Sequence, residues 1–427
     1  MDSLKKEKKR RKREEKEKKK RRKREKGGDI SMDFSLTDEQ KMIKESIRSL
    51  YKKFESKKDE LRERMLKKKQ FPQEIWDEIA KAGYIGSPIP QEYGGTGTGL
   101  LTMVFVTEEM SRFGFGNALM ILTIVDACCI LKNGTEELKR RFLPPIAEGK
   151  YKCALGVTEA DAGTNTFRIK TFAEKKNGYY TINGSKTFIT GADVSDYIML
   201  VTRTVSYNEV VEKGLPKAYG LSLFMVDLKS KGITMNLLPT KGIEGANQFT
   251  IFFEDVEVPA ENLIGDENAG SFALFKGLNP ERILAAASAV GLSEFCIEKA
   301  VDYAKDRKVF RDMPIGSYQG IQHPLAEAKI YQEAVRLLAY RAAWAFDNEM
   351  EPGIVGAYAN MAKYLGAELA LMSADRAIET LGGNGFSEEN SIIYMWEAAR
   401  LLKTAPVSKE MILNYISEHI LGLPRSY

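Results

Sequence analysis

The spacing of apolar residues changes twice along this chain of 427 residues. It has the helical period up to about residue 152, alternates from there to about residue 262, and then returns to the helical period. Helices are predicted from Thr37 onward and over 72–82, 100–113, 117–131, 135–143, 270–306, 319–348, 354–382 and 389–419. The order predicts an α+β multidomain protein with an N-terminal α-helical domain at 32–151, a β-domain at 152–262 and a C-terminal α-helical domain at 263–427.

Local signals sharpen several of these elements. Thr37 and Gln40 have the spacing of a capping box, and Pro144-Pro145 is expected to end the helix over 135–143. The β-rich stretches are separated by turn signals such as Asn183-Gly184 and Lys231-Gly232, which is typical of an antiparallel barrel or sandwich. These stretches are 179–182, 197–201, 221–226 and 249–253.

The net charge of +5 hides a division of the chain. Residues 1–26 hold 17 Lys/Arg and 6 Asp/Glu, a net charge of +11, so the remaining residues carry a net charge of −6. A mildly acidic body argues against nucleic acid as its substrate. The charged N-terminus has no apolar stretch that would indicate a secretory signal. The longest nearly apolar run, 118–131, is interrupted by Asp126 and is too short to span a bilayer.

Histidine and cysteine usage excludes several kinds of site. The only histidines are His323 and His419, so we expect neither a multi-histidine metal site nor a histidine-based triad. The four cysteines contain no C-x-x-C motif, which indicates reduced thiols in a cytoplasmic protein. The adjacent pair Cys128-Cys129 is interpreted as two buried small residues, with a redox-active pair as the alternative.

Two short segments near the start of the β-domain carry the first functional signal. Thr158-Glu159-Ala160-Asp161-Ala162-Gly163-Thr164-Asn165 offers short side chains and backbone N–H groups, which suit a phosphate. Lys186-Thr187-Phe188-Ile189-Thr190 places an aromatic side chain in a strand. Together, these segments resemble two signatures of the acyl-CoA dehydrogenases, a family of FAD-dependent flavoproteins, and the resemblance covers nearly the whole chain.

The resemblance implies a role for each segment. Thr158, Gly163 and Thr164 would lie against the flavin and its pyrophosphate, with Thr164 also facing the substrate. Phe188, where the family more often has tryptophan, would cover one face of the flavin ring, and Thr190 would form a hydrogen bond near flavin N5. The family's architecture implies an antiparallel β-domain and a C-terminal four-helix bundle.

Two further motifs imply FAD sites that are shared between subunits of a homotetramer. Arg307-Lys308-Val309-Phe310 resembles the R-x-x-F motif that contacts the FAD of a neighbouring subunit, and Gln319 follows it. Arginine suits this role because its fork of donors matches phosphate oxygens. Leu381-Gly382-Gly383-Asn384-Gly385-Phe386 resembles the family's glycine loop, in which Gly382 and Gly383 would bind the same cofactor. Its spacing is not that of a dinucleotide-binding Rossmann fingerprint.

Glu379 is a departure from the family pattern. The family often has glutamine at this position, where the side chain contacts the cofactor phosphates. A carboxylate is awkward beside phosphates unless an arginine pairs with it. The resemblance therefore implies that Glu379 binds the cofactor only if an arginine pairs with its carboxylate.

The catalytic base is implied by a substitution. Many members carry their catalytic glutamate near the C-terminus, where this chain has Thr404-Ala405-Pro406-Val407. A branch that includes the isovaleryl- and long-chain-type enzymes has the glutamate on an earlier helix before an arginine, which Glu281-Arg282 matches. Arg282 would lie near the acyl-CoA, and the N–H of Ala405 would bind the thioester oxygen. Without the resemblance, Glu281 after Pro280 is equally explained as an acid in the first turn of a helix.

The resemblance implies an FAD-dependent acyl-CoA dehydrogenase of fatty acid β-oxidation. The base would take the α-proton and the flavin would accept the β-hydrogen, giving a trans-2-enoyl-CoA. Electrons would pass to an electron-transfer flavoprotein. Two alternatives stay open: an acyl-CoA oxidase or flavin monooxygenase on the same fold, distinguished by the reaction of reduced flavin with oxygen, and a flavin- or acyl-CoA-binding protein without turnover. Chain length and branching of the acyl group are not determined by these motifs.

The basic segment at 1–31 has almost no apolar residues and is expected to be disordered or a solvated helix. Met32 directly precedes Asp33-Phe34-Ser35-Leu36-Thr37, which resembles the start of the family's sequences. The segment is therefore interpreted as an appendage. A tether to nucleic acid or to an anionic membrane is the alternative, because clustered Lys and Arg favour polyanions.

Overall fold

The computed structural model describes residues 35–425 except 117 and 244. The chain divides into two compact units, Met1–Met42 and Ile43–Tyr427. The predicted basic segment at 1–31 lies outside the described residues. Helix α2 (Asp38–Lys52) starts at a capping box: the N–H of Gln40 donates to Thr37 Oγ1 at 3.1 Å, and the N–H of Thr37 donates to Gln40 Oε1 at 3.0 Å. The predicted capping box is confirmed.

Five helices follow before the sheet: α3 (Lys58–Leu66), α4 (Gln73–Lys81), α5 (Leu100–Arg112), α6 (Ala118–Asn133) and α7 (Glu136–Ala147). The predicted end of the last one at Pro144-Pro145 is wrong, because α7 continues to Ala147 with both prolines inside it. Each proline removes a backbone donor from the helix. The last turn nevertheless buries Ile146 and Ala147, so packing outweighs the missing bonds.

The middle of the chain forms one sheet of eight strands. They are β1 (Cys153–Gly156), β2 (Phe172–Lys175), β3 (Tyr179–Thr190), β4 (Tyr197–Arg203), β5 (Leu221–Asp227), β6 (Ile233–Leu238), β7 (Gln248–Pro259) and β8 (Leu263–Ile264). The order is β6-β7-β3-β2-β4-β5-β8, with β1 beside β4. The sheet is open and sandwich-like, as one of the two predicted forms. Most neighbouring strands pair antiparallel, but β4 pairs in parallel with both β1 and β2. These parallel pairs join strands that are distant in sequence, which turn signals between neighbouring strands do not reveal.

The C-terminal part is a bundle of long helices: α9 (Gly270–Asp306), α10 (Gln319–Asp347), α11 (Pro352–Leu381), α12 (Ile392–Leu402) and α13 (Lys409–His419). The prediction for α9 over 270–306 is confirmed. The single helix predicted over 389–419 is wrong, since residues 403–408 separate α12 from α13. Pro406 lacks the N–H that a continuous helix needs, and Ser408 starts α13 by accepting the N–H of Met411 on its Oγ. A small hairpin of β9 (Lys308–Val309) and β10 (Met313–Pro314) joins α9 to α10.

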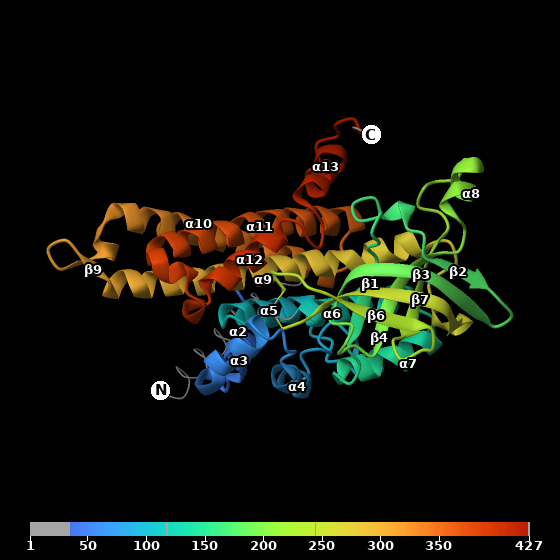
Figure 1. Cartoon of the computed structure of the whole chain (residues 1–427), viewed down its shortest axis with the longest axis horizontal. Helices are drawn as coiled ribbons and strands as arrows, with labels where there is room; N and C mark the ends of the chain where they lie inside the picture. The colour runs from blue at the N-terminus through green and yellow to red at the C-terminus, as the bar shows by residue number, and fades with distance from the viewer. Residues whose placement is uncertain (1–34, 117, 244, 426–427) are drawn as a thin grey trace, which may run out of the picture. The chain divides into compact units, whose positions relative to one another are not determined.

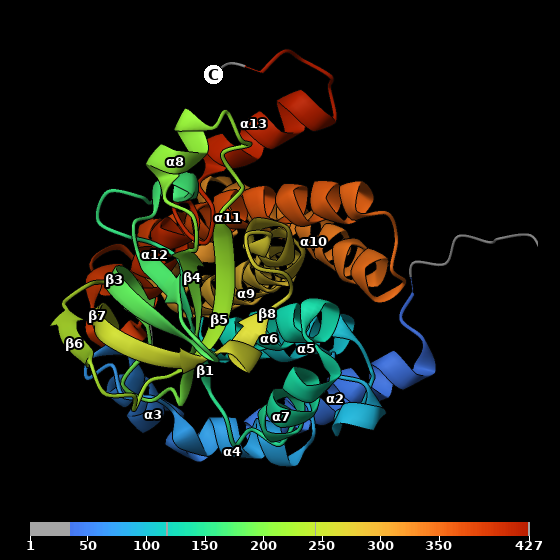
Figure 2. The same ribbon diagram turned by 90° about the vertical axis from the view of Figure 1, so that its right-hand side faces the viewer.

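Helix α9 is the central element that holds the candidate site. Figures 1 and 2 show α9 between α11 and α6, with the sheet at one end of the bundle and β9 at the other. A Cβ on Gly277 of α9 would lie 3.1 Å from the Cβ of Cys129 on α6. On the other side, a Cβ on Gly366 of α11 would lie 3.2 Å from the Cα of Ala286. Close backbone approach therefore fixes three helices against one another.

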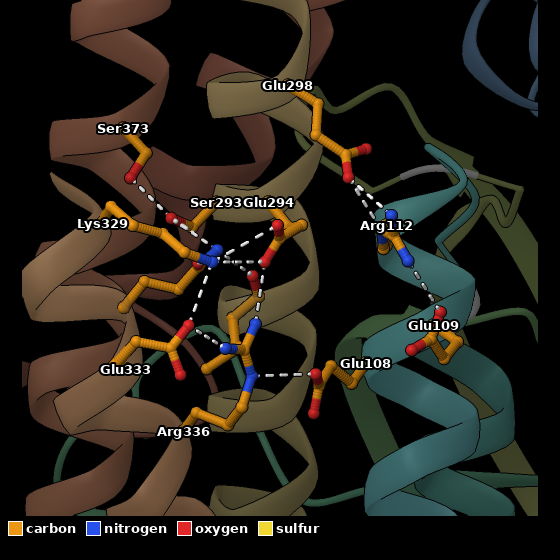
Figure 3. Close-up of polar contacts among 12 residues, drawn as sticks. Glu108, Glu109, Arg112, Ser293, Glu294, Glu298, Lys329, Glu333, Arg336 and Ser373 are labelled. Atoms are coloured by element: carbon orange, nitrogen blue, oxygen red, sulfur yellow. Dashed lines mark hydrogen bonds and ion pairs between the residues drawn. The ribbon is translucent and has the colours of Figure 1, made fainter. Parts of the chain in front are cut away.

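A cluster of ion pairs fastens α5 and α10 to α9 (Figure 3). Arg336 of α10 binds Glu108 of α5 at 3.0 Å and Glu294 of α9 at 2.8 Å. Arg112 of α5 binds Glu298 of α9 at 2.6 Å. Because every buried acid in this cluster has a basic partner, the cluster is best explained as structural.

The cysteines, the possible metal ligands and the hydropathy of the helices can be compared within the described residues. All four cysteines are free and buried, and burial raises the pKa of the Cys128 thiol to about 12, which argues against a reactive pair. In the part of the chain that the structure describes, no group of acidic, histidine and cysteine side chains could hold a metal ion. None of the described helices combines the length and apolar character needed to cross a membrane.

Candidate active site

The two segments predicted to flank the flavin are joined by a buried ion pair. Lys186 Nζ lies 2.8 Å from Glu159 Oε1, with side-chain exposures of 0% and 8%. Glu159 also accepts hydrogen bonds from the N–H groups of Lys170 and Thr171, so its carboxylate is fully used. Lys186 donates in addition to the carbonyl of Val157. The pair therefore fixes the 158–165 segment against β3.

Phe188 lies in a bulge of β3 and points its ring outward. The pairing of β3 with β7 shifts register between Lys186 and Ile189. Phe188 has a φ of +58°, which is uncommon for an aromatic residue, and its side chain is 58% exposed. Strained conformations of this kind cluster at ligand sites. Thr190 at the end of the strand accepts a hydrogen bond on Oγ1 from Gln248 Nε2 at 2.6 Å, so its own hydroxyl proton is available to a ligand.

The turn at Gly163-Thr164 offers backbone donors. Neither of these two N–H groups donates to any acceptor in the described part of the chain. A Cβ added to Gly163 would meet nothing within 4 Å, and both residues are exposed. Unpaired donors in open space can bind anionic oxygens. Thr158 is tied to the second segment, since its carbonyl accepts the N–H of Thr187 at 2.9 Å.

Glu281 is a carboxyl group in the interior of α9. It lies well after the start of the helix at Gly270, so the explanation as an acid of the first turn is wrong. It makes no hydrogen bond or ion pair with any described residue. Burial raises the pKa of Glu281 to about 7, although Arg282 and Lys363 oppose this shift. A carboxyl group with this pKa and no protein partner is suited to act as a base.

The register of α6 against α9 brings a second acid to Glu281. Cys129 Sγ lies 3.4 Å from the carbonyl of Ala273, and Asn133, one turn further along α6, approaches the same carbonyl. Gly277 packs against Cys129, whereas the earlier residue Ala273 also reaches Asn133, so the two helices run antiparallel and Asp126 lies near Glu281. Asp126 is fully buried, and neither carboxyl oxygen has a hydrogen-bond partner among the described residues. Burial, and then the charge of Glu281, raise the pKa of Asp126 well above its usual value.

Arg282, which follows Glu281 on α9, has a side-chain donor, Nε, that is not used within the described residues. Its Nη1 donates to Asn279 Oδ1 at 3.2 Å, while its buried Nε has no partner in the described residues. Burial lowers the pKa of Arg282, and the charge of Glu281 opposes this. A buried, unsatisfied arginine donor is costly and is relieved by an acceptor from a ligand.

The segment around Ala405 closes this region but does not present a free donor. The N–H of Ala405 donates to the carbonyl of Leu401 at 2.9 Å, so it is engaged within the chain. A short turn after α12 thus uses the N–H that the resemblance assigns to the thioester oxygen, and this assignment stays a prediction. Lys363 of α11 donates to the carbonyl of Val407 in the same segment.

The residues predicted to contact a neighbouring subunit's cofactor gather at the other end of the bundle. A cavity of about 510 Å³ is lined by Arg307, Glu379, Gly382, Gly383 and other residues of this end. Arg307 lies roughly 40 Å from Glu281 along α9, at 1.5 Å per residue. Within one chain, this cavity is therefore remote from Glu281.

Three predicted residues show how this end is built. Glu379 has the basic partner that an acid near phosphates needs, because Arg376 Nη1 donates to its Oε2 at 2.9 Å. Phe310 is 83% exposed, at the tip of the hairpin between α9 and α10. Gln319 is exposed as the first residue of α10. The structure shows no contact of these side chains with Glu281.

A flavin dinucleotide fits the donor set near β3. The exposed ring of Phe188 can cover a flat ring system, Thr190 has a free hydroxyl proton, and the turn at Gly163 offers unpaired N–H groups. Sequence reasoning missed Asp126, Lys363 and the Glu159–Lys186 pair. For Asp126, the available signal was an isolated charge in the otherwise apolar stretch 118–131. Lys363 had no such signal, because α11 carries several other charged residues.

Comparisons with known proteins agree along the chain. Family models described as the N-terminal, middle and C-terminal domains of acyl-CoA dehydrogenase match residues 37–150, 154–256 and 268–421. Acyl-CoA dehydrogenase fadE12 of Mycobacterium tuberculosis is 39% identical over 84% of this chain and 91% of its own length.

Solved structures agree as well. The glutaryl-coenzyme A dehydrogenase complex with glutaryl-CoA has a TM-score of 0.83 at 30% identity and covers 92% of this chain and 98% of its own. A chain solved in work on the electron transferring flavoprotein of Acidaminococcus fermentans has a TM-score of 0.83 at 29% identity, over 91% of this chain and 100% of its own.

Proposed function

Because the chain belongs to the acyl-CoA dehydrogenase family, we propose that it converts an acyl-CoA thioester to the trans-2-enoyl-CoA with Glu281 as the base. The carboxyl group of Glu281 carries the proposal: it is partly buried, has no hydrogen-bond or ion-pair partner among the described residues, and has a pKa raised to about 7 by burial. A base needs to be ionised near the working pH and basic enough to accept a proton.

FAD is the cofactor, and it supplies an acceptor for the hydride that leaves the β-carbon. The residues that would hold it near β3 are Phe188 and Thr190 at the ring and Thr158, Gly163 and Thr164 at the pyrophosphate. The buried Glu159–Lys186 pair holds these two groups in one arrangement. Positioning by packed, fully paired groups reduces the cost of binding.

The residues around Glu281 divide the work of proton removal. A carboxylate oxygen of Glu281 takes the α-proton and holds it. Burial, and then the charge of Glu281, raise the pKa of Asp126 well above its usual value and so favour its protonated form. The Nε of Arg282 is available to an oxygen of the acyl-CoA. For Ala405 to bind the thioester oxygen, its N–H would have to be shared with the carbonyl of Leu401.

Shared cofactor sites in a homotetramer explain the remote cavity. Arg307, Glu379, Gly382 and Gly383 line it, yet they lie at the opposite end of α9 from Glu281. A second copy of the chain would bring this end to the first copy's flavin, with Phe310 and Gln319 beside it. We further propose that electrons pass to an electron-transfer flavoprotein, which the similarity to the Acidaminococcus fermentans work supports, and that the enzyme acts in cytoplasmic fatty acid β-oxidation.

The proposal is tested by mixing the purified protein anaerobically with short, branched, medium and long acyl-CoAs while flavin absorbance is followed. Bleaching with one class is expected and would identify the acyl group. A yellow protein that no acyl-CoA bleaches would contradict the proposed reaction. Fast reoxidation of the bleached protein by air would favour the oxidase alternative.

Replacing Phe188 by alanine is expected to weaken FAD binding about fivefold, because an aromatic contact is worth about 1 kcal/mol beyond its buried area. The unfolding free energy of the apoprotein should change little, since the ring is 58% exposed. Fluorescence titration of apoprotein with FAD measures the affinity. Leu237→Ala is the control, because Leu237 is 59% exposed on β6 of the same sheet. Equal FAD affinities for both variants would argue against ring stacking on Phe188.

A further inference from the structure

Lys363 is a buried cation in the middle of α11. Lys363 is 2% exposed, and the buried residues near it on the helix include Ala359, Ala362 and Ala367. Its Nζ donates one hydrogen bond, to the carbonyl of Val407. An ammonium group has three donors, and the other two have no acceptor among the described residues. Burying a lysine with one acceptor is costly, so a role beyond packing needs to be considered.

The register of α11 against α9 places Lys363 beside the proposed base. A Cβ on Gly356 would lie 4.0 Å from Asn279 Oδ1, and a Cβ on Gly366 would lie 3.2 Å from the Cα of Ala286. Residue numbers rise in the same direction on both helices, so they run parallel here. Lys363 lies between these two contacts, as Glu281 does on α9. Asp126 approaches the same level from α6.

The titratable and charged groups near Lys363 come from three helices besides α11. Glu281 and Arg282 lie on α9, Asp126 on α6, and Glu410 and Tyr415 on α13. Burial, and then the charge of Arg282, lower the pKa of Lys363 to about 8, while Glu281 and Glu410 oppose this. Lys363 is thus still protonated at neutral pH, when Glu281 begins to ionise. For Asp126, burial and then the charge of Glu281 raise the pKa and favour the protonated form.

We propose that Lys363 is a positioning residue of the dehydrogenation, whose ammonium stabilises the ionised form of Glu281 while its hydrogen bond to Val407 holds the 403–408 segment that carries Ala405. The inference rests on the proposed function. It joins two sites that lie 124 positions apart in sequence, the base on α9 and the segment after α12, through one side chain on α11. Lys363 itself need not touch the substrate.

A pH profile separates this role from a purely structural one. In Lys363→Met, loss of the cation should raise the pKa of Glu281, so the acid limb of kcat/KM should move up by about one pH unit. At pH values below the shifted limb, the kcat/KM of Lys363→Met should be about tenfold lower than that of the wild type. At high pH the two values should become equal. Lys363→Arg keeps the charge and should keep the wild-type profile.

The matched control is Lys403→Met. Lys403 anchors the same segment to α11 through Glu368 at 2.7 Å, but it is not among the charges that act on Glu281. Loosening the segment through this variant should leave the acid limb in place. An unmoved limb in Lys363→Met, or the same change in both variants, would show that Lys363 only anchors the segment and would overturn the inference.

A second measurement does not depend on turnover. The unfolding free energy in urea should fall with rising pH over the window in which folded Glu281 keeps its proton, and Lys363→Met should extend that window to higher pH. If Lys363→Met does not fold, Lys363→Gln removes the charge with a donor retained. A wild-type protein that no acyl-CoA bleaches would refute the proposed function alone. If the unfolding free energy fell over the same pH range in Lys363→Met as in the wild type, the proposed role of Lys363 would be refuted.

Discussion

Glu281→Gln should lose about 10³-fold or more of the rate at which an acyl-CoA bleaches the flavin, because a positioned general base contributes about 10²–10⁴-fold. Glutamine keeps the size and polarity of the side chain but cannot accept the α-proton. The rate is measured in anaerobic stopped-flow mixing with the acyl-CoA that bleaches the wild type. Retention of the full rate would remove Glu281 as the base.

The same variant should be more stable than the wild type at neutral pH. The folded pKa of Glu281 is raised to about 7, whereas the unfolded carboxyl has its ordinary value near 4.5. The unfolded state therefore releases the proton first, and the wild-type unfolding free energy falls as pH rises from about 4.5 to about 7. The fall amounts to about 3 kcal/mol at 1.36 kcal/mol per pH unit. Glu281→Gln lacks this loss, although Asp126 contributes a further loss of the same sign in both proteins.

Glu294→Gln is the control for this prediction, with the opposite sign expected. Glu294 lies on the same helix, and although burial opposes the shift, Lys329 and Arg336 lower its pKa. Its ionised form therefore stabilises the fold, and this stability is present above the unfolded pKa and is lost as pH falls through the folded pKa. Replacing it should destabilise the protein at neutral pH. Urea unfolding at pH 4.5 and pH 8 separates the two variants.

Lys186→Met is expected to lower the unfolding free energy by about 3–5 kcal/mol, the usual cost of leaving one member of a buried ion pair without its partner. Glu159 would then be a buried carboxylate held only by the backbone N–H groups of Lys170 and Thr171 and by the hydroxyl of Thr171. Because the pair joins the two segments that are proposed to contact the flavin, FAD content should fall as well. Urea unfolding and the flavin-to-protein absorbance ratio measure the two effects.

Lys170→Met is the control for the buried pair. Lys170 Nζ lies 3.0 Å from Asp161 Oδ2 in the same region, but the two side chains are 76% and 77% exposed. Its loss should cost less than about 1 kcal/mol. Combining Lys186→Met with Glu159→Leu should recover part of the stability, since neither charge is then left unpaired. If Lys186→Met and Lys170→Met lowered the unfolding free energy equally, the buried pair would be no more stabilising than the exposed one, contrary to this prediction.

Local signals explain what was predicted well. The capping box at Thr37 and Gln40 and the bounds of α9 depend on residues within a few positions of one another, and both are confirmed. The end of α7, the break between α12 and α13, and the parallel pairs of β4 were wrong or missed. In each case, packing or pairing with distant residues decided the outcome.

The candidate site shows the same division. The segments at 158–165 and 186–190 could be recognised from sequence because their residue types are contiguous. The two charges beside Glu281 could not, because Asp126 and Lys363 come from α6 and α11 and meet α9 only through helix packing. The engagement of the Ala405 N–H by Leu401 likewise depends on how the chain turns after α12.

The sequence by itself determined the succession of helices, strands and helices, the family, and the identity of the candidate base, since periodicity and short motifs are properties of neighbouring residues. Only the tertiary structure decided whether that base is usable. The pKa of Glu281 depends on its burial and on charges from Arg282 and Lys363. Burial is produced by three helices packing together, and a buried charge interacts far more strongly than an exposed one, so the chemistry of the site is set where those helices meet.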